Sequence, residues 1–282
     1  MLTVAYLGPQ RTNTHFAAMA KFGKGHRYVH DPSIDDVFHR VEREEADCGV
    51  VPVENSLGGA VTHTLDRFIE FMKSPVRIQG EIEQPIKHYL IVRRKKDLRR
   101  IRIIYSHPQA FTQCQHWLNR FYSKAFRWET SSTAQAIHYL VFKSFSPRWK
   151  LSERAAIGPL QLAKEHALYS IEIPQEKENK TRFLILGLNP TRMGRRNKTS
   201  VLFALKDKPG ALYDALSPFK KNQINLTKIE SRPSQRKAWE YLFFIDIEGH
   251  ETEPKVKRAL KALQKHTARF RVLGSYPISG RR

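Results

Sequence analysis

The first part of the chain is organised around the stretch Cys48-Gly49-Val50-Val51-Pro52-Val53-Glu54-Asn55-Ser56-Leu57-Gly58-Gly59. Its apolar beginning predicts a buried strand, and three polar residues and a Gly-Gly pair follow within a few positions. A strand that carries Glu54, Asn55 and Ser56 to its end is typical of the ligand-binding edge of an open α/β sheet. The same pattern also fits an ordinary strand-to-helix turn in which Asn55 and Ser56 cap a helix.

Short apolar runs and amphipathic stretches alternate on the N-terminal side of this strand. Residues 4–7 predict a strand that ends at Gly8-Pro9, and residues 14–22 predict a helix. Asp31-Pro32-Ser33 predicts the start of a second helix, with one apolar face over residues 34–41. The order strand, helix, helix, strand predicts an α/β lobe with a mainly parallel sheet.

A second α/β unit and a different C-terminal unit follow. The second unit is predicted to have strands at 86–92, 101–105 and 155–158, with helices at 110–121 and 133–142. Residues 187–198 mix Gly, Pro and basic residues and predict a linker. Beyond it, strands are predicted at 200–206, 224–231, 241–247 and 270–274, with helices at 210–221 and 253–266. This βαββαβ order over about 80 residues predicts a ferredoxin-like domain, which suits a regulatory role.

The composition is that of a globular protein. The chain has 282 residues, of which 40% are hydrophobic and 27% charged. It contains no apolar run long enough for a membrane-spanning helix, and its N-terminus enters a strand-like run without a basic segment, so we expect a cytoplasmic protein without a signal peptide. Two cysteines, Cys48 and Cys114, cannot build a disulfide framework or a zinc site, and we expect reduced, buried thiols.

The charge of the chain is strongly basic, with 49 Lys and Arg against 27 Asp and Glu, a net charge of +22. Such a balance raises the hypothesis of nucleic-acid binding. The excess is spread along the chain, with one dense run at residues 93–100, and neither a zinc-finger spacing nor an RNP-type aromatic motif accompanies it. We therefore favour a solvated basic surface, with an attraction for anionic metabolites as the alternative.

Three further segments place polar residues at strand ends or ahead of predicted helices, namely residues 105–110, 131–134 and 179–183. Each alone also fits a helix cap with nothing bound. Together with residues 54–59 they predict a pocket of hydroxyls and helix N-termini, which attract anions. The sequence has no CxxC, no GxGxxG and no P-loop, and its histidines are scattered, so we expect neither a metal nor a nucleotide cofactor. The predicted substrate is a small carboxylate anion.

At this point a resemblance becomes specific. The chain resembles the prephenate dehydratase family over nearly its whole length, in residues 47–56, in 106–110 with Gln113 and Cys114, in 132–134 and in 179–183. Its C-terminal part resembles an ACT domain through Gly210-Ala211-Leu212, Ile229-Glu230-Ser231-Arg232-Pro233 and Leu273-Gly274-Ser275-Tyr276-Pro277. The resemblance implies a two-lobed catalytic domain of the periplasmic-binding-protein type at 1–187, with lobe 1 about 1–80 and 172–187 and lobe 2 about 81–171. A linker at 188–198 and an ACT domain at 199–282 would follow.

The implied activity is the loss of carbon dioxide and hydroxide from prephenate to give phenylpyruvate, without a cofactor. Arogenate is an alternative substrate. The resemblance points to Thr181 as the hydroxyl that hydrogen-bonds the departing oxygen or relays a proton, and Glu54 could supply the proton only if burial keeps it protonated. The substrate-binding residues implied are Thr12, Thr14, Asn55, Ser56, His107, Pro108, Gln109, Ala110, Ser132, Thr133, Ala134, Asn179, Arg182 and Phe183.

The ACT resemblance implies feedback inhibition by phenylalanine at an interface between chains, and so a homodimer or a homotetramer. The residues implied for that site are Gly210, Ala211, Leu212, Glu230, Ser231 and Arg232. A free amino acid needs donors for its carboxylate, and the start of the helix after Gly210 would offer them.

One segment departs from the family pattern Gly-Pro-x-Gly-Thr-Phe-Ser/Thr. Here it is Gly8-Pro9-Gln10-Arg11-Thr12-Asn13-Thr14, in which Arg11 replaces a glycine and Asn13 replaces the phenylalanine. Thr12 and Thr14 keep the hydroxyls. Either this loop has readjusted, or activity is weakened and the chain is an amino-acid-sensing homologue.

Overall fold

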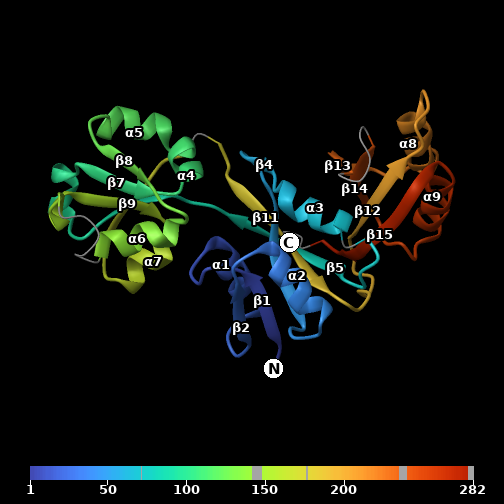
Figure 1. Cartoon of the computed structure of the whole chain (residues 1–282), viewed down its shortest axis with the longest axis horizontal. Helices are drawn as coiled ribbons and strands as arrows, with labels where there is room; N and C mark the ends of the chain where they lie inside the picture. Colours follow the sequence, from blue (N-terminus) through green and yellow to red (C-terminus); the bar gives the residue numbers. More distant parts are fainter. Residues whose placement is uncertain (71, 142–147, 176, 235–239, 279–282) are drawn as a thin grey trace.

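The computed structural model describes residues 1–70, 72–141, 148–175, 177–234 and 240–278. Three β-sheets form three lobes in a row (Figure 1). The lobe that contains the N-terminus lies in the middle, between a second α/β lobe and the C-terminal domain. This arrangement confirms the predicted fold class of two α/β lobes plus a ferredoxin-like domain.

The first lobe is built on a mixed sheet of strand order β2-β1-β3-β11-β5. Its strands are β1 (Thr3–Leu7), β2 (Arg27–Asp31), β3 (Cys48–Asn55), β5 (Arg77–Pro85) and β11 (Lys180–Gly187), and β4 (Gly59–Ala60) pairs with β3. β1 is parallel to β2 and β3, but β11 is antiparallel to both β3 and β5. Along this strand order, β2, β1, β3 and β5 thus run in the same direction, as the prediction of a mainly parallel sheet requires, and β11 is the exception because it returns from the second lobe in the opposite direction.

The helices of the first lobe are α1 (Asn13–Phe22), α2 (Ile34–Glu42) and α3 (Thr62–Glu70). α2 shows why the sequence folds as it does here. The side chain of Ser33 caps it by accepting a hydrogen bond from the Asp36 N–H. Two acidic residues in its first turn stabilise the helix by interacting with the positive end of its dipole. Its apolar face is buried as predicted, at Ile34, Val37, Phe38 and Val41.

The second lobe carries a sheet of strand order β10-β6-β9-β7-β8. Its elements are β6 (Tyr89–Val92), β7 (Ile103–Ser106), β8 (Phe126–Glu129), β9 (Arg154–Gly158), β10 (Tyr169–Glu172), the helices α4 (Pro108–Gln113), α5 (Gln115–Tyr122), α6 (Thr133–Val141) and α7 (Leu160–Glu165), and the 3-10 helices η1 (Lys95–Arg100) and η3 (Leu151–Glu153). The single helix predicted at 110–121 is two helices that meet at the buried Cys114. Residue 142, the predicted end of the next helix, lies outside the described residues.

Both cysteines are free and buried, as expected, and burial raises the pKa of each thiol to about 12. Among the described helices, none has the length and apolar character that crossing a bilayer requires.

The C-terminal domain has the predicted βαββαβ order, with an antiparallel sheet in the order β13-β14-β12-β15. Its elements are β12 (Asn197–Leu205), α8 (Ala211–Lys221), β13 (Leu226–Pro233), β14 (Tyr241–Glu248), α9 (Pro254–Lys265) and β15 (Thr267–Pro277). β12 begins inside the predicted linker, and β15 extends well beyond the strand predicted at 270–274.

Strand β12 of this C-terminal sheet is buried on both faces. On β12, Val201 and Phe203 pack with the helices α8 and α9, whereas Leu202 and Ala204 belong to the core of the first lobe. Residues that alternate in this way and are all apolar indicate a strand covered on both sides. Gly274 lets the backbone of β15 approach the backbone of β5 closely, because a Cβ atom at position 274 would lie 2.0 Å from the Ile78 carbonyl oxygen.

Candidate active site

A cavity of about 320 Å³ lies where residues of the first and second lobes meet. The first lobe contributes the start of α1, the end of β3 and part of β11, and the second lobe contributes the starts of α4 and α6. Ten of the predicted site residues line it: Thr12, Thr14, Asn55, His107, Gln109, Ala110, Ser132, Thr133, Thr181 and Phe183. Among the described residues of its lining, none is Lys, Arg, Asp or Glu, so an anion here meets neutral hydrogen-bond donors.

Asn55 is the residue that organises the cavity. Its Nδ2 donates to Asn179 Oδ1 at 2.8 Å and to Thr181 Oγ1 at 3.0 Å, and it lies 3.2 Å from the Lys180 carbonyl oxygen. Its Oδ1 accepts hydrogen bonds from the backbone N–H groups of Leu57 and Gly58. With both ends of the amide engaged, the orientation of Asn55 is set by its partners.

This arrangement leaves the hydroxyl proton of Thr181 available. Thr181 Oγ1 is the acceptor in the hydrogen bond from Asn55, so its own O–H points elsewhere. Because Thr181 lines the cavity, the hydroxyl can donate to a ligand there. Phe183, on the same face of β11, supplies apolar wall to the cavity.

A chain of polar side chains continues from Asn55 into the second lobe. Asn179 Nδ2 donates to Gln113 Oε1 at 3.0 Å, and His88 Nε2 lies 2.7 Å from the same oxygen. Since an amide oxygen only accepts, His88 donates its Nε2–H. Burial lowers the pKa of His88, although the hydrogen bond to Gln113 opposes this, so the ring is neutral at neutral pH.

His88 and Gln113 are lining residues that the predicted site did not include. Gln113 was part of a motif match but carried no predicted role. His88 lies just after the end of β5, and no motif surrounds it in the sequence. Its position after a strand end is therefore the one signal that could have identified it as a site residue. The other lining residues absent from the prediction are Leu7, Gly8, Pro9, Asn13, Pro52, Val61, Ile86 and Ser131.

Three helix starts meet at the cavity, and each has a polar cap. Thr12 Oγ1 accepts from the His15 N–H at the start of α1, His107 Nδ1 accepts from the Gln109 N–H at α4, and Ser132 Oγ accepts from the Gln135 N–H at α6. The remaining free N–H groups of a first turn carry partial positive charge. The cavity is therefore suited to carboxylate groups without a cationic side chain.

Glu54 and Arg182 were predicted as site residues, but the structure places both outside the cavity lining. They follow Val53 and Thr181 on adjacent strands, and their side chains leave the opposite face of the sheet, where Arg182 Nη2 lies 3.1 Å from Glu54 Oε2. Glu54 Oε2 is also 3.0 Å from Lys228 Nζ of the C-terminal domain. These two ion pairs direct the Glu54 carboxylate away from the cavity, whose lining does not include it.

The other predicted binding residues lie beside the cavity. Asn179 holds Asn55 and Gln113, and Ser56 Oγ bonds the backbone at Glu178 and Lys180. Pro108 is the first residue of α4, and Ala134 lines a neighbouring cavity of about 620 Å³.

In the unusual loop at residues 8–14, Arg11 makes contacts to both lobes. Arg11 has a φ of 68°, and its backbone N–H donates to His15 Nδ1 at 2.9 Å. Its side chain reaches Glu165 of α7 in the second lobe. His15 in turn stacks on Tyr6 with ring centroids 4.6 Å apart. Thr12, Asn13 and Thr14 all line the cavity, so both hydroxyls keep their place.

The residues predicted for the allosteric site lie on two separate elements. Gly210, with a φ of 77°, precedes α8, and Ala211 and Leu212 begin that helix. Glu230, Ser231 and Arg232 lie on β13, which β14 separates from β12 in the sheet. Arg232 forms a two-point ion pair with Asp66 of α3, at 3.0 and 2.8 Å. Within one chain, one group therefore lies at the start of α8 and the other on the edge strand β13.

The structure has two α/β lobes around a cavity lined by neutral donors, and a ferredoxin-like domain is joined to them. This combination is typical of a two-lobed enzyme that binds an anion and carries a regulatory domain. Comparison with known proteins makes this specific. The family model of prephenate dehydratase matches residues 4–191, and that of the ACT domain matches residues 199–264. The chain belongs to the prephenate dehydratase family and is a lyase with a C-terminal ACT domain.

Individual relatives agree with this assignment. A bifunctional chorismate mutase/prephenate dehydratase of Aquifex aeolicus is 43% identical, over 98% of this chain and 74% of that protein. A prephenate dehydratase of Methanocaldococcus jannaschii is 38% identical, over 87% of this chain and 86% of its own length. The crystal structure of prephenate dehydratase from Arthrobacter aurescens in complex with L-Phe superposes with a TM-score of 0.86 at 34% identity, over 98% of this chain and 90% of that one. The resemblance stated from the motifs is confirmed.

Proposed function

We propose that the cavity between the two lobes binds prephenate and that the Thr181 hydroxyl donates a hydrogen bond to the oxygen that leaves. One observation carries this proposal: Asn55 donates to Thr181 Oγ1 at 3.0 Å, which reserves the Thr181 proton for another acceptor. We further propose residues 1–187 as the catalytic domain, 188–198 as the linker and 199–282 as the regulatory domain.

The reaction makes modest demands on the protein. The bond between the ring and its carboxylate breaks, and carbon dioxide leaves. The electron pair moves into the ring, and the carbon–oxygen bond opposite breaks, so that hydroxide leaves and becomes water on taking a proton. Aromatisation drives these steps. What remains for the site is to orient a dianion and to stabilise the charge that develops on the departing oxygen.

The residues of the cavity suit these two tasks. Helix starts capped by Thr12, His107 and Ser132 offer N–H groups to carboxylates, and the hydroxyls of Thr14 and Thr133 add further donors. Neutral donors hold an anion without neutralising it, so the ring carboxylate keeps the negative charge that it gives up on leaving as carbon dioxide. Thr181, which lines the same cavity from β11, then serves the hydroxyl end.

We also propose that phenylalanine binds the ACT domain between two copies of the chain and inhibits the enzyme. Leu212 and Tyr213 of α8 and Ile229 of β13 are exposed apolar residues, which a second copy would cover. Gly210 adopts a left-handed conformation with nothing within 4 Å of where a Cβ would be, which leaves room for a ligand. The Arthrobacter relative that binds L-Phe supports this choice of ligand.

An ultraviolet assay for phenylpyruvate tests the proposal. Purified protein is given prephenate with and without phenylalanine, and in a parallel reaction arogenate, whose product phenylalanine is detected by chromatography. We expect phenylpyruvate from prephenate and a lower rate with phenylalanine. Turnover of arogenate to phenylalanine in preference would replace the proposed substrate, and no turnover of either would leave an amino-acid sensor.

A further inference from the structure

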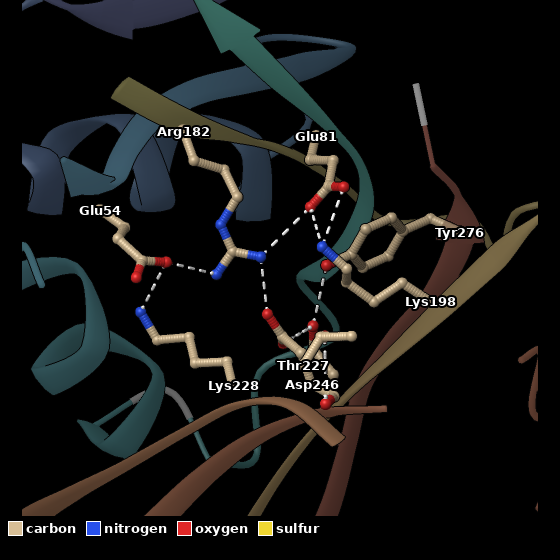
Figure 2. A network of polar contacts seen from close by, with 9 residues as sticks. Glu54, Glu81, Arg182, Lys198, Thr227, Lys228, Asp246 and Tyr276 are labelled. Atoms are coloured by element: carbon tan, nitrogen blue, oxygen red, sulfur yellow. Dashed lines mark hydrogen bonds and ion pairs between the residues drawn. The ribbon is translucent and has the colours of Figure 1, made fainter. Parts of the chain in front are cut away.

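A network of charged side chains lies between the first lobe and the ACT domain (Figure 2). It is on the face of β11 opposite the cavity. We call it the interdomain ion network. It balances three cations against three anions, with Arg182, Glu54 and Glu81 from the first lobe and Lys198, Lys228 and Asp246 from strands β12, β13 and β14 of the C-terminal sheet. Breaking a buried pair leaves an uncompensated charge, so each member constrains the others.

Arg182 is the centre of the interdomain ion network, as Figure 2 shows. Its Nη1 lies 2.6 Å from Asp246 Oδ2 and 3.2 Å from Glu81 Oε2, and its Nη2 lies 3.1 Å from Glu54 Oε2. Burial acts to lower the pKa of Arg182, but the charge of Asp246 raises it above its ordinary value, so the guanidinium stays charged. A planar group with three carboxylate partners in different directions has little freedom to move.

The ACT domain holds the opposite end of this contact firmly. Asp246 Oδ1 accepts a hydrogen bond of 2.6 Å from Ser200 Oγ, and Ser200 is 2.9 Å from the Tyr276 hydroxyl. Asp246 is buried, which by itself would raise its pKa, yet the charges of Arg182 and Lys198 keep the pKa of Asp246 below its ordinary value. Three strands of the ACT sheet thus position one carboxylate against Arg182.

The link to the cavity is the strand backbone. Thr181 and Arg182 are neighbours on β11, and opposite them on β3 stand Asn55 and Glu54, in that register. On one face of the sheet Asn55 bonds Thr181, and on the other face Glu54 bonds Arg182. Immediately after Arg182 the register with β3 shifts, so the regular ladder does not continue there. The ladder with β5 continues through this point, so the side-chain contacts of Arg182 add to the hold on β11 from the side where the pairing with β3 is interrupted.

We propose that Arg182 is a positioning residue for the reaction: the ACT domain, through Asp246, holds Arg182 and so sets the orientation of the Thr181 hydroxyl on the other face of β11. This inference rests on the proposed role of Thr181. It gives the ACT domain a part in basal turnover, in addition to any response to an amino acid.

The test is a double-mutant cycle in the full-length protein. Asp246→Asn keeps the shape of the side chain but removes its charge. We expect kcat for prephenate to fall by about tenfold or more with little change in KM, because a small misplacement near the reacting atoms is costly whereas the cavity lining is untouched. In a Thr181→Ala background, where the hydroxyl is already absent, Asp246→Asn should lower kcat no further.

Two more variants complete the design. Arg182→Lys keeps the charge but not the three-way geometry, and it should lie between the wild type and Asp246→Asn in kcat. Glu251→Gln is the matched control, because Glu251 pairs with Arg77 across the same domain boundary at 3.6 Å but outside the interdomain ion network. It should leave kcat unchanged. Thermal unfolding of every variant confirms that the comparison is made between folded proteins.

The outcomes separate the two ideas. If Asp246→Asn lowers kcat by the same factor with and without the Thr181 hydroxyl, or changes KM instead of kcat, or leaves both unchanged, Arg182 does not act through Thr181. If Thr181→Ala alone leaves kcat unchanged, the proposed function of Thr181 fails first, and the cycle reports that independently.

Discussion

Arg11 Nε lies 2.9 Å from Glu165 Oε2, and this ion pair joins the first lobe to the second beside the cavity. Both side chains are about half exposed, at 50% and 40%, so the pair contributes little to the free energy of unfolding. Its position between two lobes gives it a different effect, because it favours the conformation in which the lobes are close.

We expect Glu165→Gln to raise KM for prephenate more than it lowers kcat, because weaker closure reduces binding before it affects chemistry. Urea unfolding should show a loss of less than about 1 kcal/mol. Glu153→Gln is the control, since Glu153 pairs with Arg102 inside the second lobe. A fall in kcat at constant KM would contradict the role in closure.

Thr181→Ala should lower kcat about a hundredfold or more, because removing one donor to a developing oxyanion typically costs that much. Thr181→Ser, which keeps the hydroxyl, should retain much of the rate. Thr112→Ala is a suitable control, because the Thr112 hydroxyl bonds the carbonyl oxygen of Pro108 in the same helix. Near wild-type rates for both Thr181 variants would make Thr181 a structural residue.

Asn55→Asp tests the direction of the hydrogen bond to Thr181. A carboxylate has no N–H to donate, so it would accept the Thr181 proton and withdraw that proton from the substrate. We expect kcat to fall to about the level of Thr181→Ala, whose lost donor is worth about a hundredfold. Steady-state rates of Asn55→Asp and of the double variant with Thr181→Ala measure this. If the fold losses in kcat of the two single variants multiply in the double variant, the two residues act separately.

His88 predicts how stability depends on pH. Its folded pKa is lowered by burial, whereas in the unfolded chain the pKa is about 6.5. The unfolded state therefore binds the proton more readily, and the free energy of unfolding falls as pH drops below about 6.5 toward the folded pKa. Urea unfolding between about pH 7.5 and 5.5 should show this fall in the wild type and a smaller fall in His88→Gln.

The exposed His116 provides the control for that series, as His116→Gln should follow the wild type. Equal pH dependence in the wild type and in His88→Gln would mean that His88 is protonated as easily in the folded state as in the unfolded chain.

Gly210→Val should abolish both the inhibition by phenylalanine and the thermal shift that phenylalanine causes, while basal turnover persists. The left-handed φ of 77° disfavours a β-branched residue, and the side chain would fill the space proposed for the ligand. Gly25→Val is the matched control, because Gly25 has a φ of 97° and equally open surroundings in the first lobe. The idea would be overturned by a phenylalanine response that survives in Gly210→Val.

The sequence by itself determined the local parts of this molecule. The cap at Ser33 and the apolar face of α2, the polar ends of β3 and β7, and the βαββαβ order of the ACT domain follow from neighbouring residues, so they could be predicted. Four motif segments far apart in the chain also indicated one pocket, and residues from each of the four line one cavity. Short strands such as β2 and β10 escaped prediction because their few residues lack an apolar pattern of their own.

Only the tertiary structure decided which face each polar residue presents and which partner it meets. Glu54 and Asn55 are adjacent in the sequence, and so are Thr181 and Arg182, yet one member of each pair enters the cavity and the other enters the interdomain ion network. That division depends on the register of β3 against β11, whose paired residues Asn55 and Thr181 are 126 positions apart. Because successive side chains of a strand point to opposite faces, a shift of one residue would exchange the two roles, and no local pattern specifies that register.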